Sequence, residues 1–184
     1  ETALRTNHEN DGRPFQKELE RTAGGYQSRR VATIRKVDPP TRVVGSGDDR
    51  RVIFLTNPWL DFAGTWTARN GLAIFLEAKS TATHRLPFGR SGGLTTEQIG
   101  TIRTWRLAGA AAAVLWRYAG RVALFMPEDL AAAEARRDKS LVFARGRPVP
   151  PGEGTVIWDF LPVLERALWP PKPAPAPPTV PGSA

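Results

Sequence analysis

The stretch that most limits the fold of this chain is the apolar run Leu72-Ala73-Ile74-Phe75-Leu76, which leads directly into Glu77-Ala78-Lys79. A continuous apolar run of this length is typical of a strand buried on both faces, in the centre of a sheet covered by helices. Successive side chains of a strand point to opposite faces, so Glu77 and Lys79 share one face and Ala78 points to the other. The sequence thus predicts a central strand that ends in a paired acid and base.

The segments around this strand predict a mixed sheet covered by helices. Apolar residues at helical spacing predict helices over residues 15–28, 94–108, 127–138 and 159–169, the first opened by Pro14. Alternating or continuous apolar residues predict strands over 31–37, 51–56, 60–67, 71–79, 110–118, 121–126 and 141–143. The pair Asn70-Gly71 predicts a hairpin turn, and residues 45–50 predict a short, turn-rich excursion. This order of elements is typical of an α/β fold with a mixed central β-sheet flanked by helices.

The length of the chain and the composition of its ends predict one folded domain. A chain of 184 residues suffices for a single hydrophobic core, which we expect over residues 12–169. Residues 1–11 are polar and lack periodicity, so we interpret them as a flexible N-terminal arm. Residues 170–184 are rich in proline and alanine, which predicts a disordered tail.

The charge of the chain points to a polyanionic partner. It carries 26 Lys and Arg against 18 Asp and Glu, a formal net charge of +8. A surface of this sign is typical of proteins that bind nucleic acid. No apolar run approaches the ~20 residues that a membrane-spanning helix needs, so we expect no membrane partner. The lack of cysteine excludes disulfides and thiolate metal sites and fits a cytoplasmic protein.

A second acid upstream gives the Glu77-Ala78-Lys79 segment a chemical interpretation. Asp61 belongs to its own predicted strand, so Asp61 and Glu77 would lie at neighbouring strand ends. Two carboxylates with waters are ligands that Mg²⁺ prefers, and the backbone carbonyl of Ala78 would add a third protein ligand. Lys79 would then orient the attacking water or stabilise charge that builds on a phosphate. The alternative is an ordinary solvent-exposed pair in which Glu77 and Lys79 have no chemical role.

Several short segments resemble one nuclease superfamily. The pattern Asp…Glu-Ala-Lys resembles the motif of the PD-(D/E)xK nucleases, and its surroundings resemble the Holliday junction resolvases of the bacterial RecU type and their archaeal relatives. The matching segments are residues 12–15, 31–40, 60–64, 75–81 and 86–88, followed by the helix that carries Gln98. The likeness extends over about residues 12–130 and is strongest in Glu-Ala-Lys-x-Thr with its spaced Asp.

The resemblance implies a restriction-endonuclease-like core in a homodimer that makes paired nicks in four-way DNA junctions, during DNA recombination and repair. It implies Mg²⁺ as the cofactor, with Mn²⁺ as a substitute. By position, Asp61 and Glu77 would be metal ligands and Lys79 the catalytic lysine. The acid that the family carries on its first helix is replaced here by Gln16. Glu20, one turn later on the same helical face, is our candidate for that role, directly or through a water.

The predicted DNA surface consists of basic and polar residues around the same strands. It comprises Arg29, Arg30, Arg35, Lys36, Arg50, Arg51, Thr81, Arg85, Arg90 and Gln98. Such side chains are suited to phosphate contacts. RecU-type proteins extend a long stalk into the junction where this chain has the short excursion at 45–50. The two-fold symmetry of paired cuts and apolar strands such as residues 110–116 favour a homodimer.

Two other functions remain compatible with these residues. One is another nuclease of the same superfamily, acting on flaps, duplex ends or specific sites. The other is a non-catalytic DNA-binding module on the same fold, which the departure at Gln16 favours. In each case we expect the cytoplasm as the location, that of the host cell if a phage encodes the chain.

Overall fold

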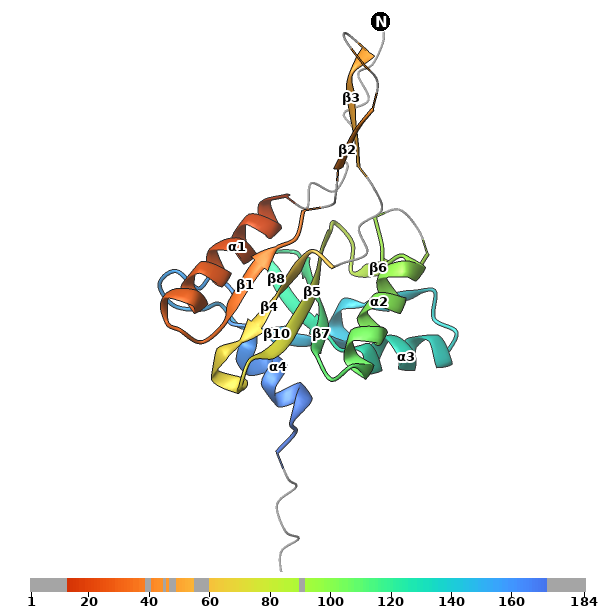
Figure 1. Ribbon diagram of the computed structural model, residues 1–184. Helices are drawn as coiled ribbons and strands as arrows, with labels where there is room; N and C mark the ends of the chain where they lie inside the picture. The colour runs from red at the N-terminus through yellow and green to blue at the C-terminus, as the bar shows by residue number, and fades with distance from the viewer. Residues whose placement is uncertain are drawn as a thin grey trace, which may run out of the picture.

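A six-stranded mixed β-sheet forms the middle layer of the molecule (Figure 1). This computed structural model describes residues 13–38, 41–44, 46, 49–54, 60–89 and 92–171. The strands run in the order β1 (Thr33–Lys36), β4 (Phe62–Trp66), β5 (Leu72–Thr81), β7 (Ala111–Tyr118), β8 (Arg121–Phe125) and β10 (Arg147–Val149). Neighbouring strands are antiparallel except β5 and β7, which are parallel. The predicted α/β fold with a mixed central sheet is confirmed.

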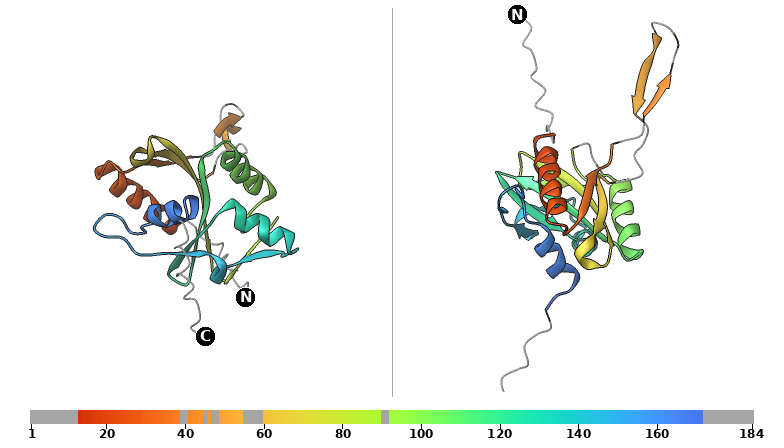
Figure 2. Two further views of the ribbon diagram at one scale, coloured as in Figure 1. Left: turned by 90° about the horizontal axis from the view of Figure 1, so that it is seen from below. Right: turned by 60° about the vertical axis from the view of Figure 1, so that its left-hand side comes forward.

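Helices cover both faces of this sheet. α1 (Arg13–Ser28) and α4 (Leu161–Leu168) lie on one face, and α2 (Thr96–Leu107) and α3 (Pro127–Ala135) lie on the other (Figure 2). Because side chains alternate along a strand, β5 contributes Ile74 and Leu76 to the core under α1 and Phe75 to the core under α2. Burial on both faces explains the continuous apolar run. In the described part of the chain, no helix is long and apolar enough to cross a membrane.

Local sequence signals set the beginnings of the helices. The four predicted helices correspond to α1, α2, α3 and α4, with ends that differ by a few residues. α2 begins with a capping box formed by Thr95 and Gln98, in which each side chain accepts from the other residue's backbone N–H. α3 begins with Pro127, whose missing N–H costs nothing in the first turn. The stripe of α1 that includes Phe15 and Leu19 is buried against the sheet, as its spacing predicts.

The hairpin between β4 and β5 turns where Asn70-Gly71 predicts it. A short 3-10 turn, η2 (Thr67–Arg69), precedes these residues. Asn70 and Gly71 have φ angles of 53° and 74°, a left-handed region that asparagine and glycine tolerate best. In β4, Gly64 faces the neighbouring strand so closely that a Cβ there would overlap the carbonyl oxygen of Thr33. The close pairing of β1 with β4 therefore requires glycine at this position.

The apolar strand predicted at residues 110–118 lies inside the protein. It forms β7, between β5 and β8 in the sheet, and both helical layers cover it. Each residue from Ala111 to Trp116 is 0% exposed. Burial within one chain explains the apolar character of this strand. The interpretation of residues 110–116 as support for a dimer interface is therefore wrong.

Two further strand pairs lie outside the central sheet. β2 (Thr41–Val44) pairs with β3 (Arg51–Phe54) in a hairpin that stands away from the body (Figures 1 and 2). The sequence predicts only a short excursion over 45–50, so the hairpin is longer than expected. β6 (Arg85–Pro87) pairs with β9 (Ser140–Val142). The sequence does not predict the strand β6. The 3-10 turn η3 (Phe143–Arg145) then leads to β10. The predicted arm at 1–11 and the tail from residue 172 onward lie outside the described residues.

Candidate functional site

Asp61 and Glu77 meet because β4 and β5 pair in antiparallel register. Phe62 pairs with Leu76. In an antiparallel pair the residue before Phe62 lies opposite the residue after Leu76, so Asp61 lies opposite Glu77. Oδ2 of Asp61 accepts a hydrogen bond from the backbone N–H of Ala78 at 2.9 Å. The two predicted acids therefore lie together at one end of the sheet.

Glu77 is a buried acid at the end of β5. Its side chain is only 2% exposed. Nζ of Lys79, two residues later on the same face, lies 2.9 Å from Oε1 of Glu77. Gln98, in the first turn of α2, donates from Nε2 to the same oxygen at 2.5 Å. Burial at this level excludes the alternative in which Glu77 is part of an ordinary solvent-exposed pair.

The cap of α2 determines which end of the Gln98 amide faces Glu77. Oε1 of Gln98 accepts from the backbone N–H of Thr95 at 3.0 Å, and the backbone N–H of Gln98 donates to Oγ1 of Thr95 at 3.2 Å. Because the amide oxygen is used at the cap, the amide NH₂ group is directed to Glu77. The DNA contact that the sequence predicts for Gln98 stays a prediction, and in the structure its side chain donates to Glu77. The signal available in the sequence was the capping-box spacing Thr95-x-x-Gln98.

The two carboxyl groups oppose each other's ionisation. Burial, followed by the charge of Asp61, raises the pKa of Glu77 to about 7, against the opposing charge of Lys79. Burial also raises the pKa of Asp61, which the N–H of Ala78 and then the charges of Lys79 and Lys36 oppose. Hydrogen bonding between the two carboxyl groups further raises the pKa of Glu77 and lowers that of Asp61. The pair therefore retains a proton near neutral pH, which a bound cation would displace.

The donors at this site fit a hard divalent cation. Asp61 and Glu77 supply carboxylate oxygens, and Lys79 and Gln98 both contact Oε1 of Glu77. A residue in an antiparallel ladder directs its N–H and C=O toward the same neighbour, so the Ala78 carbonyl faces the Asp61 side as its N–H does. Carboxylate and carbonyl oxygens with waters suit Mg²⁺ and Mn²⁺. Within the described ranges, His, Cys, Asp and Glu form no metal-binding group of three or more, so a cation here relies on two acids.

Glu20, the candidate for the helix acid, contacts Lys36 and not the acid pair. Nζ of Lys36 lies 3.9 Å from Oε1 of Glu20 and 3.6 Å from Oδ1 of Asp38. The charge of Lys36 also lowers the pKa of Asp61, against the larger effect of burial. Glu20 is thus linked to the acid pair through a lysine, and its role as a metal ligand stays a prediction. Gln16 is half-buried on the same helix.

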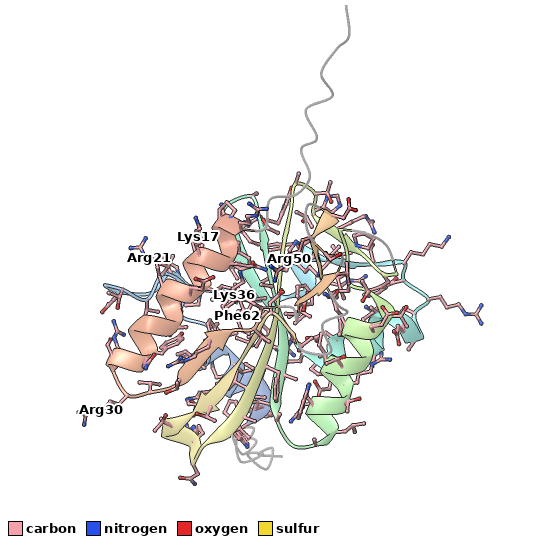
Figure 3. The ribbon with its side chains drawn as sticks, turned by 45° about the horizontal axis from the view of Figure 1, so that its top comes forward. Lys17, Arg21, Arg30, Lys36, Arg50 and Phe62 are labelled. Atoms are coloured by element: carbon pink, nitrogen blue, oxygen red, sulfur yellow. The ribbon has the colours of Figure 1, made fainter. Side chains whose placement is uncertain are left out.

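Arg35 and Lys36 are the predicted DNA residues at the site end of β1. Lys36 pairs with Phe62, next to Asp61, and Figure 3 shows Lys36 and Phe62 together in the view onto this end of the sheet. Arg35 pairs with Ala63 and is exposed. As successive residues of one strand they point to opposite faces of the sheet, and of the two only the charge of Lys36 acts on Asp61.

Thr81 and Arg85 lie on the path from β5 to β6. The hydroxyl of Thr81 donates to the carbonyl of Thr83 at 2.7 Å and accepts from the indole N–H of Trp116 at 2.8 Å. Trp116 is fully buried, so Thr81 satisfies a polar group that has no access to water. Arg85 is exposed and donates to Oγ of Ser140 at 3.4 Å. Thr81 therefore has a structural task that the sequence did not indicate, whereas Arg85 faces solvent.

Arg29 and Arg30 lie at the other end of the first strand from Lys36. Arg29 donates to the carbonyl of Glu153 at 2.7 Å, and Arg30 lies at the far end of α1 in the view of Figure 3. The chain turns between α1 and β1 at these arginines and reaches Lys36 only at the end of the strand. The expected cluster of Arg29, Arg30, Arg35 and Lys36 is therefore divided between the two ends of β1.

Arg50 and Arg51 lie on the projecting hairpin. Arg51 pairs with Val44 at the outer end of β2 and β3, so both arginines are remote from the acid pair. Arg90 lies outside the described residues. Contacts of these three arginines with DNA stay predictions.

No protein-family model matches this chain. No curated protein sequence matches it either. The geometry of Asp61, Glu77 and Lys79 is therefore the basis on which a function can be assigned.

Proposed function

We propose that this chain is a Mg²⁺-dependent endodeoxyribonuclease with a restriction-endonuclease-like core. The observation that carries the proposal is the meeting of Asp61, Glu77 and Lys79 at the end of one central strand, with 2.9 Å between Lys79 and the buried Glu77. A buried acid pair is costly for a folded protein, and perturbed pKa values concentrate at functional sites. A site that holds a cation against both acids accounts for this cost.

The residues of the chain divide the chemistry of phosphodiester hydrolysis among them. Asp61, Glu77 and the carbonyl of Ala78 would hold the cation. When bound, Mg²⁺ supplies polarisation of the phosphate and a lower pKa for an attacking water. Gln98 keeps the Glu77 carboxylate in a fixed orientation. Lys79 remains 19% exposed, so its ammonium group can donate to the attacking water or to a non-bridging phosphate oxygen, where charge builds in the transition state.

Four-way DNA junctions are the substrate that we propose for this site, with the cytoplasm as the location and a homodimer as the active form. The net charge of +8 supports a nucleic-acid substrate. The resemblance to RecU-type resolvases supports a junction. The β2–β3 hairpin adds support, because it projects from the body at the position where RecU-type proteins carry their stalk.

Cleavage of labelled DNA with and without Mg²⁺ tests the proposal. We expect nicking of a four-way junction in Mg²⁺ and none in a chelator, with much less cutting of plain duplex and of flaps. Asp61→Asn and Lys79→Ala should each reduce the rate about 100-fold or more while junction binding changes little. Full activity of either variant would contradict the assigned site. Equal cutting of duplex would favour another nuclease of the superfamily, and tight, salt-sensitive binding without nicking would favour a non-catalytic module.

The homodimer has its own test. Paired nicks on opposite strands require two active sites related by a two-fold axis. Sedimentation at micromolar concentration should give twice the mass of the chain, and a monomer, both alone and on the junction, would contradict a dimeric resolvase.

A further inference from the structure

A basic groove lies on the solvent-facing side of the paired strands β6 and β9. Its volume is about 560 Å³, and the described residues that line it are Thr83, Arg85, Pro87, Phe88, Lys139 and Ser140. This volume lies in the range of small-molecule and cofactor sites. The lining combines two cations, two hydroxyls and one aromatic ring, with no acid among the described residues.

The cations of this groove have no acidic partner in the part of the chain that the structure describes. Arg85 donates only to the hydroxyl of Ser140, at 3.4 Å, and Lys139 is exposed. The neighbouring acid, Asp138, is already paired with Arg136 at 3.1 Å and Arg145 at 2.9 Å. Arg85 and Lys139 thus present positive charge to solvent, where an anion can bind.

The position of Phe88 favours a ligand with a planar ring as well as a phosphate. Its side chain is half-buried at the wall of the groove. The backbone N–H of Phe88 donates to the carbonyl of Lys139 at 3.0 Å, so the two residues lie on neighbouring segments at the groove. Aromatic side chains next to phosphate-binding cations are typical of surfaces that bind single-stranded nucleic acid, because an unpaired base stacks on the ring. A base inside a duplex is stacked on its neighbours and is not available to Phe88.

Short connections join the groove to the nuclease site. From Lys79 the chain reaches it through Thr81, whose hydroxyl donates to the carbonyl of Thr83, and the hydroxyl of Thr83 donates to the carbonyl of Arg85 at 2.9 Å. On the other side, the N–H of Leu94 donates to the carbonyl of Pro87 at 2.9 Å. Leu94 immediately precedes the cap that orients Gln98. The loops that form the groove are therefore tied by hydrogen bonds to both elements that carry the acid site, β5 and α2.

We propose that this groove binds an unpaired segment of the substrate strand, with its phosphates on Arg85 and Lys139 and a base against Phe88. The inference rests on the proposed nuclease function and adds one property to its substrate: a strand whose bases open at the branch point of a four-way junction is held better than a strand within plain duplex. The binding of such a segment requires no metal, because the groove contains no metal ligand.

Fluorescence anisotropy in a chelator separates this inference from the nuclease function. The probe is a labelled oligothymidylate of about 15 nucleotides, compared with a duplex of equal length. Arg85→Gln combined with Lys139→Gln should weaken oligothymidylate binding about 10-fold, and Phe88→Leu about 5-fold. The matched control is Lys17→Gln combined with Arg21→Gln, which removes the same charge from the outer face of α1, in the opposite helical layer (Figure 3). The control should change binding less than about 2-fold.

Each outcome of this experiment has a defined meaning. Equal losses in the groove variant and in the α1 control would overturn the inference, because they would reflect total charge alone. Duplex binding that falls as much as oligothymidylate binding would also overturn it, since the groove would then contact any phosphate backbone. If the protein cleaves no DNA but the groove variants still lose oligothymidylate binding, the proposed groove is supported and the proposed nuclease function is contradicted. Thermal unfolding of Arg85→Gln with Lys139→Gln should match the wild type, because both side chains are exposed.

Discussion

Gln98 donates to Glu77 with the same side-chain amide that caps its own helix, at 2.5 Å on one end and 3.0 Å on the other. The capping box and the acid pair thus share one residue. A helix terminus, which every α-helix must satisfy in some way, here also determines the orientation of a buried carboxylate.

Gln98→Glu separates these two tasks. Glutamate at this position retains the cap, because its carboxylate accepts from Thr95, but it replaces an N–H donor toward Glu77 by a second negative charge. The pKa of Glu77 should rise further, so the pH for half-maximal nicking should move upward and the rate near neutral pH should fall about 10-fold. A pH profile of nicking measures this, and an unchanged profile would show that Gln98 acts only on the helix. Gln98→Ala, which loses both tasks, should in addition lower the melting temperature.

Glu77→Gln should stabilise the metal-free protein at alkaline pH. The pKa of Glu77 is about 7 in the folded protein against an ordinary 4.5, so the folded state holds the proton more tightly than the unfolded state. Its contribution is fully present below about pH 4.5 and is lost as the pH rises through about 7. At about pH 8 the variant should therefore exceed the wild type by about 3 kcal/mol, and at about pH 4 the two should be nearly equal. Urea unfolding in a chelator at both pH values measures the difference, and a constant difference would contradict the raised pKa.

Gly64→Ala should destabilise the fold severely. The added Cβ would overlap the Thr33 carbonyl, so β1 would have to move away from β4. We expect a loss of about 3 kcal/mol or more in unfolding free energy. Gly100→Ala is the matched control: Gly100 lies within α2, and its added Cβ would meet no heavy atom within 4 Å. That variant should gain up to about 1 kcal/mol, because alanine favours helix. Similar effects of both variants would show that β1 does not approach β4 this closely.

Thr81→Val tests whether Thr81 stabilises the core or contacts DNA. Valine retains the shape but leaves the indole N–H of the buried Trp116 without an acceptor. The free energy of unfolding should fall by about 1–3 kcal/mol, and DNA affinity should change little. Thr81→Ser retains the hydroxyl and should behave like the wild type in both respects. Weaker DNA binding by a Thr81→Val protein of unchanged stability would instead support the predicted DNA contact.

Patterns within single segments predicted most of the fold. The apolar run ending at Leu76, the stripe of α1 and the Asn70-Gly71 turn each depend on neighbours in sequence, and each is confirmed. The short strands β2, β6 and β10 were not predicted, because three or four residues carry too little periodicity to distinguish a strand from a loop. The sequence also did not show that residues 110–116 pair between β5 and β8, since a buried strand and an interface strand have the same composition.

The candidate site was predicted only in part, because patterns within single segments determine some of its contacts and tertiary packing determines the others. The spacing of the motif placed Asp61 near Glu77, and strand alternation placed Lys79 on the face of Glu77. The roles of Gln98 and Lys36 depend on where α2 and β1 pack against these strands, which no local pattern determines. Helical spacing predicts that Glu20 lies one turn from Gln16. It does not predict that Glu20 lies beside Lys36, because that contact depends on tertiary packing.

The parallel pairing of β5 with β7 has a consequence for the order in which the protein can be made. Every residue assigned to the acid site, from Lys36 to Gln98, leaves the ribosome before β7 (Ala111–Tyr118) does. Until then the edge of β5 that carries Glu77 has no partner for its N–H and C=O groups, because β7 is the strand that pairs with it. A nascent chain that stops short of Tyr118 would contain every residue of the acid site without the site itself. The proposed activity would therefore require the second half of the domain to be synthesised, although that half supplies no acid to the site.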